Sequence, residues 1–205
     1  MKAFLIIVSA IVGYFIGSLN FAVIIGKLFY KKDVRNIGSK SAGATNTLRS
    51  LGKKAAIAVT IGDFLKGVAA YLLCELIGKY SGIGEYTSVV GGFSAIIGHD
   101  FPFYFRFKGG KGVLTSLALS FMIDVRGGIM ALSFAILIMI LTKYVSLGSM
   151  LGCALNAVVI WFLIPGEYFR CIVVVLAVII AILKHKSNII RLIKGEERKF
   201  GQKAE

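Results

Sequence analysis

The sequence predicts an all-α integral membrane protein with about seven transmembrane helices. The chain of 205 residues is 57% hydrophobic, compared with about 45–50% in soluble domains, and its mean hydropathy is +0.83. The apolar residues lie in long runs, several of which approach the ~20 residues that a helix needs to cross hydrocarbon. The basic residues gather between alternate runs. We therefore expect one polytopic membrane domain over residues 1–205.

The candidate spans follow from these runs. In chain order they are residues 3–26, 55–77, 86–105, 112–123, 127–142, 145–164 and 168–183. The first is too long for the ~7–15-residue core of a signal peptide, so we expect a retained helix. The fourth and fifth are short, because about twelve helical residues rise only ~18 Å against ~30 Å of hydrocarbon. We expect these two to tilt, to begin within the bilayer or to form a re-entrant hairpin.

Lysine and arginine predict the orientation. Residues 27–54, residues 106–111, Lys143 and the tail from 184 onward hold 19 of the 24 basic residues. The opposite side holds 4, and Lys66 lies inside a span. Since cytoplasmic loops carry the excess of positive charge, we expect the N-terminus outside, the C-terminus in the cytoplasm and an odd number of crossings.

The composition also limits the classes of partner. A net charge of +14 favours anionic lipids and anionic substrates. Nucleic acid is not expected, because no basic stretch lies on a separable soluble domain. The three cysteines, Cys74, Cys153 and Cys171, lie in apolar runs and are expected to be small buried hydrophobic residues. No spacing typical of metal ligands is present, so we expect neither a metal nor another cofactor.

The first polar segment, residues 33–52, combines residue types that bind phosphate. Its glycine, hydroxyl, amide and arginine residues are Gly38, Ser39, Ser41, Gly43, Thr45, Asn46, Thr47, Arg49 and Gly52, with Arg35 before them. Small residues let backbone N–H groups approach an oxyanion, and arginine can bind phosphate with two hydrogen bonds. The alternative is a flexible connecting loop whose basic residues only follow the positive-inside rule. The local sequence leaves both interpretations open.

The second polar segment, residues 99–113, carries a GGKG motif before an apolar helix. The motif consists of Gly109, Gly110, Lys111 and Gly112. Helix N-termini bind phosphate through free N–H groups, and glycines allow a close approach; the motif is not a P-loop. The alternative is a basic interfacial turn in which Lys108 and Lys111 extend toward the headgroups. We favour phosphate binding, and expect His99 to be a capping or interfacial histidine.

Two further pairs of polar residues are notable. His185 and Asn188, three residues apart, share one face of a helix, and the residues that follow predict an amphipathic helix along the inner membrane surface. Asp63 and Lys66 are also three residues apart, inside the second span. A charge at the bilayer centre costs about 2.5–3.5 kcal/mol. We therefore expect Asp63 and Lys66 to form an ion pair with each other or with the loop. A direct role of Lys66 in substrate binding is the alternative.

Together these segments resemble the acyl-phosphate:glycerol-3-phosphate acyltransferases, the PlsY family. The matching pieces are GS at 38–39, GATNTLR at 43–49, DFLKG at 63–67, HDFPFYFRFKGGKGVLT at 99–115 and HKSNIIRLIKGEE at 185–197. They appear in the family's order. The family commonly has GSGN where this chain has Gly38-Ser39-Lys40-Ser41, so no role of that glycine and asparagine is carried over to Lys40 and Ser41.

The resemblance implies acyl phosphate and glycerol 3-phosphate as substrates, membrane lipids as surroundings, and the bacterial cytoplasmic (inner) membrane with the active site on its cytoplasmic side. We expect a monomer, although the sequence itself does not reveal the oligomeric state. Motifs and resemblance together assign catalytic roles to Ser39, Arg49, Lys111, His185 and Asn188. They assign substrate contacts to Gly43, Thr45, Asn46, Lys66, Lys108, Gly109, Gly110 and Gly112. They assign structural roles to Asp33, Asp63 and Glu196.

The expected reaction is direct acyl transfer. No His-x4-Asp pattern occurs, and no cysteine lies in a charged motif, so we expect no acyl-enzyme. Either the phosphate of the donor or His185 would accept the hydroxyl proton. A transporter would need polar residues near the bilayer midplane and often repeated halves. A lipid-binding scaffold would not need the GGKG motif or the paired His185 and Asn188.

Overall fold

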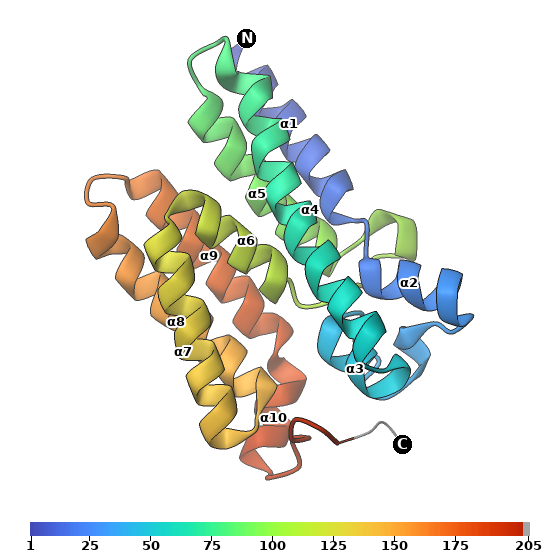
Figure 1. Cartoon of the computed structure of the whole chain (residues 1–205). Helices are drawn as coiled ribbons and strands as arrows, with labels where there is room; N and C mark the ends of the chain where they lie inside the picture. The colour runs from blue at the N-terminus through green and yellow to red at the C-terminus, as the bar shows by residue number, and fades with distance from the viewer. Residues whose placement is uncertain (203–205) are drawn as a thin grey trace. The chain divides into compact units, whose positions relative to one another are not determined.

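The structure, a computed structural model, describes residues 1–202, and these residues form α-helices joined by short loops (Figure 1). The described part of the chain contains no β-strand, which confirms the all-α prediction. Contacts between residues divide it into two compact units, residues 1–119 and residues 120–202, with the boundary inside one helix. The units are described separately below, and a single domain over residues 1–205 stays a prediction.

The first unit is built around three long helices. Its elements are α1 (Lys2–Gly17), α2 (Phe21–Tyr30), the 3-10 helix η1 (Val34–Asn36), α3 (Ala44–Leu51), α4 (Lys53–Lys79), α5 (Gly84–Asp100), the 3-10 helix η2 (Phe103–Phe105) and the start of α6 (Val113–Ile123). Helices α1, α4 and α5 pack against one another, while α2 and α3 pack against each other and against α4.

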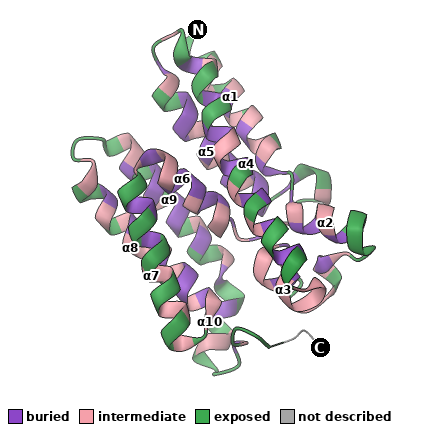
Figure 2. Ribbon diagram, viewed as in Figure 1, coloured by how far each residue is buried: buried purple, intermediate pink, exposed green. Residues whose placement is uncertain are grey.

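Helices α1 and α5 approach closely because glycines face the contact. A Cβ atom added to Gly13 would overlap the backbone of Gly91, and one added to Gly17 would overlap the backbone of Ala95. Gly13 and Gly17 are buried residues of α1, and Gly91 and Ala95 are buried residues of α5. Figure 2 shows buried residues along both helices. Small residues of this kind let membrane helices pack backbone to backbone.

The second unit contains the end of α6 together with α7 (Val125–Thr142), α8 (Val145–Leu163), α9 (Tyr168–Lys184) and α10 (Lys186–Ile193). Helix α8 packs against both α7 and α9. Helix α7 begins at Asp124, whose side chain accepts hydrogen bonds from the backbone N–H groups of Arg126 and Gly127. This is a regular N-cap, which satisfies donors that the first turn leaves unpaired.

Most predicted spans agree with the helices, and two differ. Residues 55–77, 112–123, 127–142, 145–164 and 168–183 match α4 and α6–α9 within about two residues at each end. The first prediction, residues 3–26, was wrong as a single helix, because the chain breaks between α1 and α2, where Asn20 caps α2. The third, residues 86–105, extended too far: α5 ends at Asp100, and Pro102 disfavours helical backbone at the residue before it.

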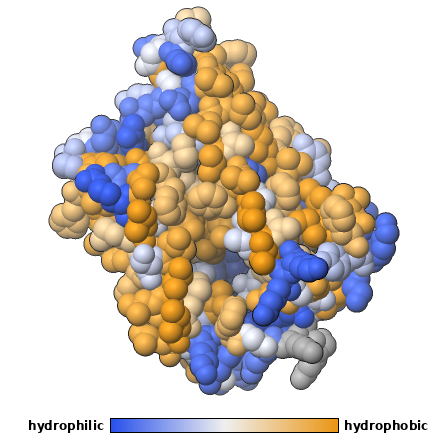
Figure 3. All heavy atoms as spheres, viewed as in Figure 1, coloured by the Kyte–Doolittle hydropathy of each residue, from blue (hydrophilic) through white to orange (hydrophobic). Residues whose placement is uncertain are grey.

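Several helices are long and apolar enough to cross a bilayer. Among residues 1–202 these are Lys2–Tyr30 taken as one stretch, α4, α7 and α8, and a fifth if α9 and α10 form one span bent by 57°. Hydrophobic side chains cover much of the helix sides in Figure 3, and hydrophilic ones gather near helix ends and loops. The chain is an integral membrane protein, whereas seven crossings and their orientation stay predictions.

Candidate active site

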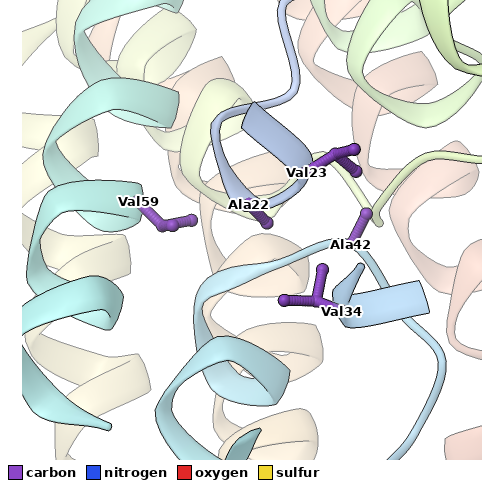
Figure 4. Close-up of a cluster of buried hydrophobic side chains, with 5 residues drawn as sticks. All are labelled: Ala22, Val23, Val34, Ala42 and Val59. Atoms are coloured by element: carbon purple, nitrogen blue, oxygen red, sulfur yellow. The ribbon is translucent and has the colours of Figure 1, made fainter. Parts of the chain in front are cut away.

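The first loop, defined here as residues 31–43, is fixed to the helices beside it by a small apolar cluster. Val34 and Ala42 of the loop lie with Ala22 and Val23 of α2 and Val59 of α4, and none of these five is exposed. Figure 4 shows their side chains gathered between the loop and the two helices. This anchoring favours a shaped loop over a flexible connection.

The side chain of Asn46, in the first turn of α3, determines the path of the first loop. Its Nδ2 donates toward the backbone carbonyls of Val34 (2.8 Å), Ile37 (3.0 Å) and Ser41 (3.0 Å). Its Oδ1 accepts a hydrogen bond from the backbone N–H of Ser39 at 2.9 Å. The side chain is 2% exposed. The polar atoms of Asn46, expected to contact substrate, are thus already used within the loop.

The hydroxyl of Ser39 is presented at the surface. Ser39 is exposed while its backbone is held by Asn46. Its neighbours Gly38 and Lys40 both have positive φ, at 61° and 57°, a conformation that turns the chain sharply and favours glycine. The loop then enters α3 at Gly43, where a Cβ atom would meet nothing within 4 Å. Open space therefore lies beside the first turn of α3.

Further along the same helix, Thr45 in its first turn and Arg49 in its last turn are both half-buried. The sequence assigned substrate contact to Thr45 and catalysis to Arg49, and both roles stay predictions.

The side chain of Arg35 connects the first loop to the second loop, defined here as residues 101–112. Arg35 contacts Asp33 through Nη2 to Oδ2 at 2.7 Å and Nε to Oδ1 at 3.0 Å. Its Nη1 donates to the carbonyl of Phe105 at 2.9 Å, and the guanidinium lies over the ring of that residue. The hydrogen bond from Arg35 is the main reason that the pKa of Asp33 is lowered to about 2. The structural role of Asp33 stays a prediction.

The glycines of the second loop pack against protein backbone. The N–H of Gly110 donates to the carbonyl of His99 at 3.1 Å. A Cβ atom at Gly110 would overlap His99 Nε2 and lie 2.7 Å from the carbonyl oxygen of Ala42 in the first loop. Gly109 is similarly close to the carbonyl of His99, and Gly112 has a φ of 64°. The GGKG glycines thus bring the two loops together.

The two lysines of the second loop differ in exposure. Lys111 follows Gly110 directly and is half-buried, whereas Lys108 is exposed. The first two polar segments therefore meet, with a basic residue next to their junction.

The ion pair predicted inside the second span is present and larger than expected. Lys66 Nζ lies 2.8 Å from Asp63 Oδ1, 2.9 Å from the carbonyl of Leu19 and 2.8 Å from His99 Nδ1. Three acceptors match the three N–H donors of an ammonium group. His99, expected to be capping or interfacial, is 4% exposed and belongs to this cluster. No pattern in the sequence predicted that His99 would contact Lys66, which lies 33 residues earlier in the chain.

The third polar segment lies in the second unit. His185 ends α9 and is 3% exposed. Its Nδ1 lies 2.7 Å from the carbonyl of Ala181, and because a carbonyl only accepts, Nδ1 carries a proton. In the neutral ring the lone pair is then on Nε2. Asn188, one turn further, donates from Nδ2 to Glu197 Oε1 at 2.6 Å.

The carboxylate that organises this segment is Glu197, and the structural role predicted for Glu196 is corrected accordingly. Glu197 is 8% exposed and accepts hydrogen bonds from Ser146 (2.7 Å), Asn188 and Arg191 (2.7 Å). Glu196 is exposed. Gly195, with a φ of 70°, turns the chain so that the second of two adjacent glutamates faces inward.

Burial alone would raise the pKa of Glu197, but hydrogen bonds from Ser146, Asn188 and Arg191 together hold this pKa below its ordinary value. Within residues 1–202, no group of three or more histidine, cysteine, aspartate or glutamate residues is arranged to hold a metal ion.

Comparisons with known proteins place the chain in a family. A profile of the family described as Glycerol-3-phosphate acyltransferase matches residues 7–195. A glycerol-3-phosphate acyltransferase of Finegoldia magna is 40% identical over 98% of this chain and 100% of the relative. One of Thermoanaerobacter pseudethanolicus is 42% identical over 97% of this chain and 98% of the relative.

Solved structures agree with the sequence comparisons. The structure of PlsY (YgiH), an integral membrane glycerol 3-phosphate acyltransferase in its glycerol 3-phosphate form, superposes with a TM-score of 0.87 at 33% identity, over 96% of each chain. A lysophosphatidic acid form of that protein gives a TM-score of 0.83 at 31% identity, over 96% of this chain and 95% of that one. This chain therefore belongs to the glycerol-3-phosphate acyltransferase family, as its three polar segments indicated.

Proposed function

We propose that this chain transfers a fatty acyl group from acyl phosphate to the sn-1 hydroxyl of glycerol 3-phosphate. The products are 1-acyl-glycerol 3-phosphate (lysophosphatidic acid) and inorganic phosphate, in the first step of membrane phospholipid synthesis. Family membership supports the acceptor, because the solved relative is described in a glycerol 3-phosphate form and in a lysophosphatidic acid form. The acyl phosphate donor rests on the resemblance of the motifs.

One observation carries the proposal: the first and second loops meet. Arg35 donates to the carbonyl of Phe105, and Gly110 lies against the carbonyl of Ala42. The exposed Ser39 and the open first turn of α3 belong to one side of this junction, and Lys111 belongs to the other. Both substrates carry phosphate, which hydroxyls, helix N-termini and basic side chains bind well.

The proposed reaction is a direct transfer. The hydroxyl oxygen of glycerol 3-phosphate attacks the acyl carbonyl, an ester C–O bond forms, and the C–O bond to phosphate breaks. Acyl phosphate is an activated mixed anhydride, so positioning and charge stabilisation suffice. We assign stabilisation of the developing negative charge to Ser39, Arg49 and Lys111. The hydroxyl proton ends on the released phosphate.

The alternative proton acceptor is His185. Its Nδ1–H is held by the carbonyl of Ala181, which leaves Nε2 as the basic atom. Asn188 is proposed to act beside it in catalysis, oriented by Glu197. Turnover of a His185→Gln variant separates the two acceptors: a rate near that of the wild type removes His185 from the base role, and a loss of several orders of magnitude assigns it that role.

We also propose that the chain is a monomer of the bacterial cytoplasmic membrane with seven crossings, its N-terminus outside and its active site facing the cytoplasm. The support is the basic residues, 19 of 24 on the side that holds the polar segments. In this arrangement α6, with 11 residues, crosses only part of the hydrocarbon.

A comparison of donors tests the proposal most directly. Purified protein is supplied with glycerol 3-phosphate and palmitoyl phosphate, palmitoyl-CoA or palmitoyl-acyl carrier protein, and lysophosphatidic acid is measured. We expect product from palmitoyl phosphate at a rate at least about tenfold above that from either thioester. The thioesters lack the acyl phosphate group, so the site cannot use its phosphate contacts to stabilise their transition state. Equal rates would contradict the donor assignment. Uptake of glycerol 3-phosphate into vesicles without product would favour a transporter, and retention of lipid alone would favour a scaffold.

A further inference from the structure

A buried contact between Lys66 and His99 reaches from helix α4 to the junction of the two loops. Lys66 is held by Asp63 on its own helix and by the carbonyl of Leu19, at the break between α1 and α2. Its third partner is His99 Nδ1, in the last turn of α5. Lys66 and His99 are each 4% exposed, so both are tied into the interior of the first unit.

Each ring nitrogen of His99 has a different neighbour. His99 Nδ1 lies 2.8 Å from Lys66 Nζ and 3.5 Å from Asp63 Oδ1. We assign the shorter contact as the hydrogen bond; a charged Lys66 has only donors, so in this assignment Nδ1 accepts and the proton of the neutral ring is on Nε2. Nε2 lies against Gly110, at the point where the second loop meets the carbonyl of Ala42. The backbone of His99 contributes as well, because its carbonyl accepts from the N–H of Gly110 at 3.1 Å.

We propose that His99, oriented by Lys66, is a positioning residue that holds the glycine-rich segment 109–112 against the first loop for binding of glycerol 3-phosphate. This inference rests on the proposed function. Lys111 follows Gly110 directly, so a shift of Gly110 also displaces the backbone that carries this cation. Glycerol 3-phosphate has no acyl chain to add apolar binding energy, and its affinity depends on such polar contacts.

Two variants of His99 test whether its side chain positions residues 109–112 through its Nε2 atom or only fills the space beside them. The amide nitrogen of His99→Gln can reach the place of Nε2, whereas the shorter amide of His99→Asn reaches only the place of Nδ1. We expect His99→Asn to raise the KM for glycerol 3-phosphate about tenfold with kcat within about twofold, the pattern of lost binding. His99→Gln should restore KM to within about threefold of the wild type.

Ser88→Ala is the matched control. Ser88 is also buried on α5, and its hydroxyl donates to the carbonyl of Glu85 near the other end of the helix. We expect its KM to equal that of the wild type. Equal KM values for His99→Asn and the wild type would overturn the inference, as would equal losses in His99→Asn and His99→Gln.

Amide hydrogen exchange reports the same contact without turnover. In folded protein we expect the amide of Gly110 to exchange at least about tenfold faster in His99→Asn than in the wild type, since its hydrogen bond to the carbonyl of His99 opens more often. His99→Gln and Ser88→Ala should keep the slow exchange. Unchanged exchange in His99→Asn would overturn the positioning role even with an active enzyme. Faster exchange in a protein that makes no lysophosphatidic acid would instead refute the proposed function alone.

Discussion

The side chain of Asn46 faces three backbone carbonyls of the first loop. An aspartate has the same size, but its oxygens would repel those carbonyls and would no longer donate to them. We expect Asn46→Asp to lower the free energy of unfolding by about 1–3 kcal/mol, the cost of leaving buried polar groups unsatisfied, and to abolish activity. Thermal unfolding in detergent and turnover measure both effects.

Asn36→Asp is the control for this change, because Asn36 lies in the same loop and is exposed. Its stability and activity should stay close to those of the wild type. Equal stability of the two variants would contradict the role assigned to the Asn46 side chain.

Glu197 and Glu196 provide a second test at the residue scale, since they are adjacent and chemically identical. A glutamine at 197 would place an NH2 group against donors from Ser146, Asn188 or Arg191. We expect Glu197→Gln to lower the unfolding temperature by several degrees, as loss of a buried hydrogen-bond network does, and Glu196→Gln to leave it unchanged. A lower unfolding temperature in Glu196→Gln than in Glu197→Gln would instead support the structural role for Glu196.

The pH dependence of stability follows from the lowered pKa of Glu197. Its ordinary value is 4.5, and the folded value lies below that. The ionised carboxylate therefore contributes stability above pH 4.5, and that contribution is lost as pH falls through the folded pKa. We expect the stability difference between the wild type and Glu197→Gln to be constant near neutral pH and to shrink only below about pH 4.5. A difference that shrinks as pH rises would contradict this sign.

At the scale of elements, the packing of α1 on α5 depends on glycine. A Cβ atom at Gly13 would overlap the backbone of Gly91, which cannot move as a side chain could. We expect Gly13→Ala to lower the free energy of unfolding by about 1–3 kcal/mol, the cost of overpacking. The same change at Gly43, where a Cβ atom meets nothing within 4 Å, should cost less, because it only replaces the glycine N-cap of α3 by alanine. Urea or thermal unfolding in a fixed detergent compares the two; equal stabilities would refute the close approach.

Sequence patterns predicted the long helices well, because apolar runs of this length have few other structures in a bilayer. They missed the break between α1 and α2, since apolar residues continue through Leu19 and the interruption depends on the cap from Asn20. They also missed α3, because its apolar residues Ala44, Leu48 and Leu51 recur at helical spacing over only eight residues within a polar segment. Its formation depends on tertiary contacts of Asn46 with the first loop.

Candidate site residues could be named from the sequence where their chemistry is specific, and not where a role depends on geometry. Ser39, Arg49 and the GGKG glycines stood out by type and spacing. The roles of His99 and Glu197 depend on partners many residues away, Lys66 and Ser146. No local pattern distinguishes Glu197 from Glu196, because only the turn at Gly195 decides which of the two faces inward.

At the scale of the whole molecule, the proposed orientation predicts which loops are reached from which side of the membrane. The natural cysteines Cys74, Cys153 and Cys171 are first replaced by alanine. Single cysteines are then placed at Lys40, in the first loop before α4, and at Tyr80, which directly follows the C-terminal end of α4. In right-side-out vesicles, we expect an impermeant maleimide to label Tyr80→Cys, and to label Lys40→Cys only after lysis, as positive-inside insertion requires. The opposite pattern would invert the topology.

The central claim is that the protein transfers an acyl group from acyl phosphate to glycerol 3-phosphate, and that Ser39 of the first loop takes part in this reaction. The most direct measurement follows inorganic phosphate release by the purified protein from palmitoyl phosphate, with and without glycerol 3-phosphate. Wild type is compared with Ser39→Ala and with the control Ser41→Ala. We predict release that requires both substrates, falls at least about 100-fold in Ser39→Ala, as loss of a charge-stabilising donor does, and persists in Ser41→Ala. Absence of release by folded wild type, or equal release by Ser39→Ala, would contradict the account.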